Sequence, residues 1–377
     1  MDDARAARES ATRDEAFMRR ALELAAQGPL ADPNPCVGAV VLDAAGEVAG
    51  VGFHRGAGTP HAEAVGLEQA GERARGGTCY VTLEPCDHVG RTPACSAALI
   101  HAGVARVVVA GSDPNPVASG GLVRLRAAGV ETRTGLLDAE AEALNREWLH
   151  TMRTGRPFVT WKVASTLDGR TAAADGTSRW ITGEAARHDV HELRSRVGAV
   201  LVGTGTAFAD DPALTVRDSD GRTTGAQPLR VVMGERCEEL PRTARLRDGS
   251  APTLFLPTRD PDAALAELRT HGVRHVLLEG GATLAAAFLR SGVVDEIVAY
   301  LAPALLGAGP AAVGDLGITT IAETTRLRIT DVRLVGDDVR LVAAPLPRPA
   351  GDRAYHDPRE TATSGALSHP GHPEGRS

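Results

Sequence analysis

The chain has 377 residues, more than a single hydrophobic core usually serves, so we expect two domains. Hydrophobic residues make up 43% and charged residues 24%, which is typical of a globular, water-soluble protein. The formal net charge of −7 argues against general electrostatic binding of nucleic acid, but it allows a local basic patch for a phosphorylated small molecule.

The five cysteines are odd in number and dispersed, so they do not suggest a disulfide framework and favour a reducing cytoplasm. The first residues are polar and lack the apolar segment of a signal peptide. No apolar run approaches the roughly 20 residues that cross a membrane. We therefore expect a cytoplasmic protein with neither a membrane nor nucleic acid as its partner.

Residues 1–14 are charged, and we expect them to be flexible. Apolar residues recur on one side of a helix from Glu15 to Gln27, and Pro33 and Pro35 then end the helical pattern. Strands and helices alternate beyond this point, which predicts a layered α/β domain over residues 15–150. We expect its strands at 37–42, 48–53, 79–83 and 104–110, and its later helices at 62–73, 94–102, 121–128 and 138–150.

A second α/β pattern begins after a short polar linker at 151–157, and we place this domain at 158–346. The end of the chain, 347–377, is rich in Pro, Gly, His and charge without apolar periodicity, so we expect a disordered tail. The second domain is expected to have strands at 158–165, 199–203, 229–233, 253–256, 275–279 and 296–302, helices at 184–197, 262–270 and 283–291, and a closing β-hairpin at 327–342.

The strongest chemical signal is His61-Ala62-Glu63 followed by Pro85-Cys86 and by Cys95. One imidazole and two thiolates can hold zinc and leave a fourth position open for water, which is the arrangement of a catalytic zinc. Glu63 is not needed as a ligand and is free to move protons, as in the zinc deaminases with their H-x-E…P-C-x-x-C pattern. The residues therefore predict hydrolytic deamination of a heterocycle, with Glu63 as the proton carrier.

Eight residues separate Cys86 from Cys95, whereas the short pattern has two, and this departure narrows the family. One alternative to a catalytic zinc stays open. A structural zinc site would require a fourth ligand, for which His88 is the nearest candidate. The remaining three cysteines have no partner at metal-ligand spacing, and we interpret them as small apolar residues.

The second half contains no full G-x-G-x-x-G after its first strand, so a Rossmann domain is not predicted. Glu279-Gly280-Gly281 lies between an apolar strand and a helix, where backbone N–H groups can approach a phosphate. The same glycines would equally serve a tight turn.

Ordered motifs extend through both halves. The first half has DPNPCVG at 32–38, GFH at 52–54, HAE at 61–63 and LEPCDHVGRTPAC at 83–95; the second has KVASTLDGR at 162–170, SRWIT at 178–182, TGTAFADDPALTVR at 204–217 and EGGATL at 279–284. Together they resemble the bifunctional deaminase/reductase family of riboflavin biosynthesis over about residues 14–345. The long insert between the two cysteines is typical of that family. The resemblance implies an N-terminal cytidine-deaminase-like α/β/α domain and a C-terminal dihydrofolate-reductase-like α/β domain.

The implied substrate is 2,5-diamino-6-ribosylamino-4(3H)-pyrimidinone 5′-phosphate. It would lose its exocyclic amine at one zinc ion, and NADPH would then reduce the ribosyl side chain to ribityl. Asn34 and His54 match positions that line the pyrimidine pocket, and His88 and Arg91 match the loop that meets the phosphate. As plain structural residues, Asn34 would be a turn asparagine, His54 a strand-end histidine and Arg91 a solvated loop charge. The family is often oligomeric through its second domain, so we expect a homo-oligomer.

In the second domain, residues matching NADPH positions are Ala164, Trp180, Thr206, Asp210, Gly281, Ala282, Thr283 and Leu284. Residues matching substrate positions are Ser178, Arg194, Leu214, Arg217 and Glu279. Lys162 and Asp168 are also typical of the family. Lys162 would bind substrate, assist proton transfer or form a structural ion pair, and Trp180 could instead be a packing residue.

Three departures from the family pattern weaken the reductase prediction more than the deaminase prediction. Ser119-Gly120-Gly121 lacks the usual Lys or Arg, and Thr166 and Gly183 replace common serines. One alternative is a single-function or redirected pyrimidine deaminase whose second domain is not catalytic. Others are a non-catalytic structural zinc protein and a nucleic-acid-binding zinc module, although the basic stripe and stacking aromatics of the last are missing.

Overall fold

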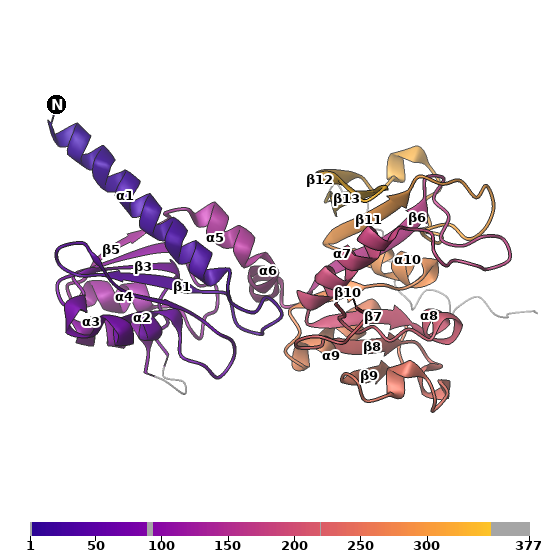
Figure 1. The fold of residues 1–377 in the computed structure, drawn as a ribbon, viewed down its shortest axis with the longest axis horizontal. Helices are drawn as coiled ribbons and strands as arrows, with labels where there is room; N and C mark the ends of the chain where they lie inside the picture. The colour runs from indigo at the N-terminus through magenta and orange to yellow at the C-terminus, as the bar shows by residue number, and fades with distance from the viewer. Residues whose placement is uncertain (1, 89–92, 219, 348–377) are drawn as a thin grey trace, which may run out of the picture. The chain divides into compact units, whose positions relative to one another are not determined.

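The computed structural model describes residues 2–88, 93–218 and 220–347. Each half of the chain contains its own β-sheet with helices packed on it (Figure 1). The predicted tail lies outside the described residues apart from Pro347. In the part of the chain that is described, no helix is both long enough and apolar enough to cross a bilayer.

The first sheet has the order β2-β1-β3-β4-β5. β1 pairs with β2 and β3 in antiparallel register, and β3, β4 and β5 run parallel. The strands are β1 (Gly38–Leu42), β2 (Val48–Phe53), β3 (Thr78–Leu83), β4 (Arg106–Gly111) and β5 (Glu131–Thr134). The helices are α1 (Asp2–Ala25), α2 (Ala62–Ala70, continued by a 3₁₀ turn at Gly71–Ala74), α3 (Cys95–Ala102), α4 (Gly121–Ala127), α5 (Asp138–Leu144) and α6 (Arg146–Thr154).

Helices cover both faces of this sheet, which explains why its central strands are apolar on both sides. α1 and α5 bury residues such as Met18 and Ala141 against one face, together with Val40 and Val108. α2, α3 and α4 pack on the other face around Leu99 and neighbouring apolar residues. The expected α/β/α layering of the first domain is therefore confirmed.

The structure differs from the predicted elements at three places. α1 begins at Asp2 and not at Glu15, and β5 was not predicted. The helix expected at 138–150 is two helices, because buried Asn145 accepts a hydrogen bond from the backbone N–H of Cys36 (2.8 Å) and donates one to its carbonyl (2.9 Å). The second of them, α6, runs four residues into the segment expected to be a linker.

Asp14 anchors α1 to the sheet although it falls in the segment expected to be flexible. It is 2% exposed and accepts hydrogen bonds from Tyr80 on β3 (2.7 Å), Arg106 on β4 and Arg133 on β5. Burial alone would raise its pKa, but the hydrogen bonds from Arg106 and Tyr80 outweigh that effect and the pKa is lowered. The charged residues before Glu15 thus include a buried structural group.

The second sheet has the order β12-β13-β11-β6-β10-β7-β8-β9, and its six strands from β11 to β9 run parallel. The strands are β6 (Phe158–Thr166), β7 (Ala199–Gly203), β8 (Leu229–Met233), β9 (Thr253–Leu256), β10 (His275–Leu278), β11 (Glu296–Ala302), β12 (Leu327–Val335) and β13 (Asp338–Pro345). The helices are α7 (Glu184–Ser195), α8 (Thr204–Asp210), α9 (Pro261–Thr270) and α10 (Ala282–Arg290), with 3₁₀ turns at Cys237–Glu239, Arg245–Arg247 and Ile321–Glu323.

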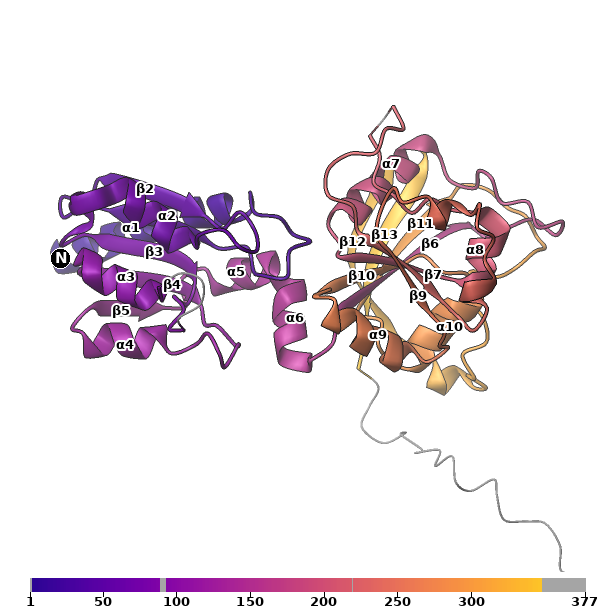
Figure 2. The same cartoon turned by 90° about the horizontal axis from the view of Figure 1, so that it is seen from below.

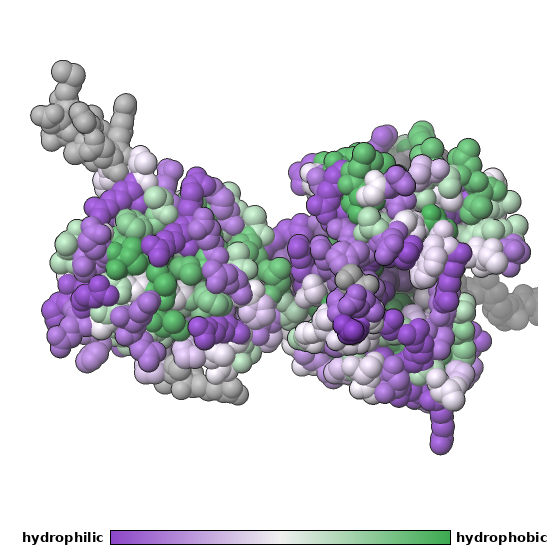
Figure 3. All heavy atoms as spheres, in the orientation of Figure 1, coloured by the Kyte–Doolittle hydropathy of each residue, from purple (hydrophilic) through white to green (hydrophobic). Residues whose placement is uncertain are grey.

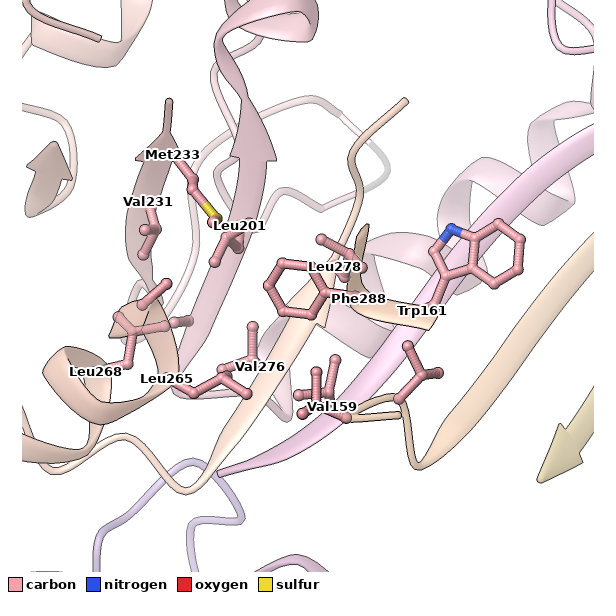
Figure 4. Close-up of a cluster of buried hydrophobic side chains, with 14 of the residues drawn as sticks. Val159, Trp161, Leu201, Val231, Met233, Leu265, Leu268, Val276, Leu278 and Phe288 are labelled. Carbon is pink, nitrogen blue, oxygen red and sulfur yellow. The ribbon is translucent and has the colours of Figure 1, made fainter. Parts of the chain in front are cut away.

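The largest core cluster of the second sheet lies beneath α9 and α10. Phe288 from α10 and Leu265 from α9 belong to one cluster with side chains of strands β6 to β11, among them Trp161 and Leu278 (Figure 4). α7 lies on the opposite side of the sheet (Figure 2) and packs on Tyr300 and neighbouring residues. The predicted strands of this domain and its closing hairpin are all present, whereas α8 was not predicted.

Glycines let the helices of the first domain approach its strands at backbone distance. A Cβ atom on Gly52 of β2 would lie 2.3 Å from the carbonyl oxygen of Ala62 in α2, and one on Gly50 would lie 2.1 Å from that of Gly66. Gly38 of β1 approaches α1 in the same way. These contacts fix the height of α2 above the sheet, and α2 directly follows His61.

Gly52→Ala should therefore displace α2 and destabilise the first domain. Overpacking of this kind costs about 1–3 kcal/mol. Thermal unfolding of the purified variant, with zinc content measured in parallel, should show a lower unfolding temperature and less bound metal. Gly205→Ala is the matched control, because a Cβ there meets nothing within 4 Å. Equal stability of the two variants would contradict the proposed role of this contact.

Candidate active sites

Three potential metal ligands converge beyond the carboxyl end of β3, the central strand of the first sheet. Nδ1 of His61 lies 3.6 Å from Sγ of Cys86 and 3.3 Å from Sγ of Cys95, and the three ligand atoms all lie within 4.8 Å of one another. Zn–S bonds of about 2.3 Å and Zn–N bonds of about 2.0 Å in a tetrahedron would hold these atoms about 3.6 Å apart. The donor set therefore fits zinc in both chemistry and spacing.

The ligands come from segments that the fold holds firmly. His61 is the N-cap of α2, Cys95 is the first residue of α3, and Cys86 lies in the loop after β3. The backbone N–H of Cys95 donates to Sγ of Cys86 at 3.4 Å. Hydrogen bonds from the Cys95 thiol and from His61 lower the pKa of Cys86, and the bond to Cys86 raises the pKa of His61.

His88 does not join this cluster. In the residues that the structure describes, the only group of three or more His, Cys, Asp or Glu ligands at metal-binding distance is His61, Cys86 and Cys95. Nδ1 of His88 is buried and has no hydrogen-bond partner among them. This geometry favours three protein ligands and an open fourth position over a closed structural site.

Glu63 lies in the first turn of α2 and is 3% exposed. Burial raises its pKa to about 7. A carboxyl group with a pKa near neutrality can both accept and donate a proton at physiological pH. The nearby charge of a bound dication would favour the carboxylate form, in which Glu63 acts first as a base.

Contacts with the start of α4 hold the loop that carries Cys86 in place. Oε1 of Glu84 accepts hydrogen bonds from the backbone N–H groups of Gly120 (3.1 Å) and Leu122 (3.2 Å) at the start of that helix. A Cβ atom on Gly121 would lie 1.8 Å from the carbonyl oxygen of Pro85. The Ser119-Gly120-Gly121 departure thus lies beside the metal loop, and Gly121 is required there for close packing.

Asn34 and His54 lie side by side near this site. Nδ1 of His54 lies 3.3 Å from the carbonyl oxygen of Pro60, which can only accept, so that nitrogen carries the proton. In that tautomer Nε2 of His54 accepts from Nδ2 of Asn34 at 3.2 Å. This hydrogen bond fixes the orientation of the Asn34 side-chain amide, so that its Oδ1 can contact a ligand. Arg91 lies outside the described residues.

The second domain has a cavity of about 890 Å³ at the carboxyl ends of its parallel strands. This is where open α/β sheets bind ligands. Seven of the eight residues matched to NADPH line it, namely Ala164, Thr206, Asp210 and Gly281 to Leu284. A Cβ atom on Gly280 would lie 2.5 Å from Cδ2 of Leu284, so a side chain there would have to displace that leucine. The size of the cavity and the bare backbone at the start of α10 fit a dinucleotide.

Lys162, Ser178 and Glu279 line the same cavity. Arg194 holds Glu279 through two hydrogen bonds of 2.6 and 2.8 Å. Burial alone would raise the pKa of Glu279, but the Arg194 guanidinium outweighs it and the pKa is lowered. Burial lowers the pKa of Lys162, which brings its ammonium closer to releasing a proton.

Five residues matched to the second site do not line the cavity. Arg194 acts behind Glu279, and Arg217 donates to Thr215 (3.0 Å). Leu214 is buried with a positive φ of 51°, and Trp180 is 70% exposed with the Arg187 guanidinium 4.4 Å from its ring centroid.

Asp168, the fifth, accepts from Thr166 (2.6 Å) and from the backbone of Leu306 and Gly307, so it stabilises a turn. Thr166 stands where the family commonly has serine, and it therefore preserves the hydroxyl group that donates to Asp168. At Gly183, the backbone N–H donates to Asp338 (2.7 Å).

Sequence reasoning assigned no role to four residues that the structure places at the two sites. Glu84 lies inside the LEPC motif, and Asn145 fixes the Cys36 backbone two residues after Asn34. Arg236 and Arg259 line the second cavity. The position of each arginine three residues after the end of an apolar strand was a signal that could have identified the pair.

Comparison with known proteins gives matches for both halves. Residues 11–111 match the cytidine and deoxycytidylate deaminase zinc-binding region, and residues 157–341 match the RibD C-terminal domain. The riboflavin biosynthesis protein RibD of Mycobacterium tuberculosis is 49% identical over 310 residues, which cover 82% of this chain and 90% of that protein. RibD of Escherichia coli is 43% identical over 361 residues, covering 87% and 98%.

Solved structures agree with this result. Acinetobacter baumannii RibD gives a TM-score of 0.81 at 42% identity and covers 89% of this chain and 100% of its own. A Thermotoga maritima protein described as a diaminohydroxyphosphoribosylaminopyrimidine deaminase/5-amino-6-(5-phosphoribosylamino)uracil reductase gives 0.81 at 33% identity with the same coverage.

Cys86→Ala should abolish tight zinc binding, because two protein ligands remain where three are required. Wild-type protein should hold one zinc per chain by elemental analysis after dialysis. Cys237→Ala is the matched control, since Cys237 is also buried but lies in the second domain. Retention of one zinc by the Cys86 variant would contradict the assigned ligand set.

Proposed function

The chain belongs to the RibD family of riboflavin-biosynthesis proteins, and on that premise we propose that it is a bifunctional deaminase and reductase that performs two consecutive steps. The observation that carries the proposal is that each half brings together its own chemical groups. The first has three zinc ligands beside a buried acid, and the second has a dinucleotide-sized cavity beside Lys162 and Glu279. The substrate we propose is 2,5-diamino-6-ribosylamino-4(3H)-pyrimidinone 5′-phosphate.

In the first step, a water molecule adds its oxygen to the ring carbon that bears the exocyclic amine. Glu63 takes a proton from that water and delivers protons to the ring nitrogen and then to the amine, which leaves as ammonia. Zinc at His61, Cys86 and Cys95 would supply a Lewis acid that activates water at neutral pH. Asn34, oriented by His54, would bind the pyrimidine edge.

In the second step, the open form of the sugar gains a hydride at carbon 1 and a proton at the adjacent nitrogen. NADPH supplies the hydride, and the chain positions cofactor and substrate. We assign the proton to Lys162, whose buried ammonium lies in the electrostatic field of Glu279 and Arg194. Trp180, Leu214 and Arg217 would serve as binding residues that complete the site around the substrate, and Asp168 as a turn residue that supports the loop after β11.

The assembly and location of the protein belong to the same proposal. β12 exposes apolar side chains, including Ile329 (58%) and Leu334 (74%), and apolar surface gathers over this hairpin in Figure 3. We propose a homo-oligomer formed through the second domain, because exposed edge strands with apolar residues favour pairing. The thiolate ligands need a reducing environment, so we place the protein in the cytoplasm.

The function is tested by giving zinc-loaded protein the proposed substrate and following products by mass spectrometry. Without NADPH the product should have exchanged its amine for oxygen and released ammonia. With NADPH it should also have gained two hydrogens. Deamination without reduction would contradict the reductase assignment, and no change in either sample would contradict the proposed substrate.

Glu63→Gln should lower ammonia release by about 100-fold or more, since general acid–base catalysis contributes at least this much. Zinc content should stay at the wild-type level, and reduction of the deaminated intermediate should be unchanged because it occurs in the other domain. Glu68→Gln, on the exposed face of the same helix, is the matched control. Wild-type ammonia release by the Glu63 variant would disprove its role.

A further inference from the structure

Eight residues separate the two cysteine ligands of the first site, so the chain between them does not by itself fix the distance between their thiolates. In the short C-x-x-C pattern only two residues intervene, and the chain keeps the two sulfur atoms close together. A longer connection allows many more separations of its ends. Contacts outside the connection must therefore hold Cys86 and Cys95 at the spacing that zinc requires.

A hydrogen bond joins the two residues that directly follow the ligands. Oγ of Ser96 donates to Oδ1 of Asp87 at 2.6 Å. Asp87 follows Cys86 and Ser96 follows Cys95, so each partner in this bond is one residue away from a ligand. Ser96 is 0% exposed, and a buried hydroxyl group without a partner is costly. The bond is therefore not readily exchanged for one to water.

Two backbone N–H groups join the same segments. The N–H of Ser96 donates to the carbonyl oxygen of Cys86 at 3.2 Å, and the N–H of Cys95 donates to Sγ of Cys86 at 3.4 Å. Together with the side-chain bond between Ser96 and Asp87, they attach the first turn of α3 to the loop after β3 at three places. The two thiolates are thus held in one unit.

The α4 segment fixes the Asp87 side of this unit. Nη1 of Arg124 donates to the same Oδ1 of Asp87 at 3.0 Å, and the backbone N–H of Asp87 donates to the carbonyl oxygen of Ala118 at 2.9 Å. The Arg124 side chain is 48% exposed, so this ion pair contributes little energy and chiefly orients the carboxylate. Glu84 binds the start of α4 on the other side of Cys86, so that both flanks of this ligand are held.

We propose that Asp87 and Ser96 form a clamp that sets the separation of the Cys86 and Cys95 thiolates and so strengthens zinc binding. The inference rests on the proposed zinc chemistry of the first domain and adds to it two positioning residues that act through the thiolates. Groups that orient metal ligands typically change metal affinity 10- to 100-fold. Neither Asp87 nor Ser96 belongs to the assigned ligand set, so replacing them leaves all three ligands in place.

The test is the zinc affinity of the full-length protein, measured by competition with a chromophoric chelator. Ser96→Ala and Asp87→Ala should each weaken zinc binding roughly 10- to 100-fold. The double variant should bind zinc no more weakly than the weaker single variant, because both changes remove the same hydrogen bond. Asp87→Asn should bind zinc more tightly than Asp87→Ala, because it keeps the oxygen that accepts from Ser96.

Asp43→Ala is the matched control. Asp43 accepts hydrogen bonds from the backbone N–H groups of Ala45 (3.0 Å) and Glu47 (2.9 Å) in the turn between β1 and β2. This turn lies toward the amino end of β3, whereas Cys86 follows its carboxyl end. The control should lower the unfolding temperature and leave zinc affinity unchanged.

Four results would overturn the clamp. They are wild-type zinc affinity in the Ser96 variant, additive losses in the double variant, equal zinc affinities of Asp87→Asn and Asp87→Ala, and an equal loss of affinity in the Asp43 control. A wild-type protein that binds no zinc would instead disprove the proposed deaminase chemistry itself.

Discussion

The close approach of backbones at glycines is the constraint on which the first active site depends. Gly50 and Gly52 bring α2 down onto β2, and Gly121 brings the start of α4 against Pro85. His61 and Glu63 belong to the first of these units, and Cys86 belongs to the second. Because the three ligand atoms must meet within a few ångströms, a small displacement of either unit would separate them. The metal site is therefore arranged by packing that lies outside it.

The two domains arrange charge at their candidate sites in different ways. In the first, the Asn34–His54 pair and the buried acid Glu63 lie beside three ligands for zinc, which would supply positive charge. In the second, charges of both signs converge on one cavity, and the Arg194–Glu279 pair keeps a buried carboxylate ionised there. This difference agrees with the two chemistries, since hydrolysis needs an activated water molecule and hydride transfer needs a positioned cofactor.

The sequence was sufficient where a local pattern decides the structure. The apolar strands of both sheets have strong periodicity, and His61, Glu63, Cys86 and Cys95 form a spacing that few structures other than a zinc site explain. The sequence was insufficient where a residue far away in the chain determines the local structure. The break at Asn145 depends on the backbone of Cys36, and the burial of Asp14 depends on arginines of β4 and β5. Neither partner can be identified by periodicity.

At the candidate sites, too, the sequence identifies the residues within motifs but not those that only the fold brings together. Ala164, Thr206 and Glu279 were assigned by motif, and the structure places all three on one cavity. Arg236 and Arg259 lie outside those motifs, and they become candidates only once β8 and β9 are known to be neighbours. Asp168 is the opposite case. It belongs to a motif, but it stabilises a turn and does not line the cavity.

We propose that three protein ligands hold the zinc and leave its fourth position open. X-ray absorption spectroscopy at the zinc edge is the test, using wild-type protein and a His88→Ala variant. We expect two sulfur scatterers at about 2.3 Å and two lighter ones at about 2.0 Å, with spectra that are identical in the two proteins. Loss of a light-atom scatterer or of imidazole scattering in the variant would identify His88 as a fourth ligand and contradict the account.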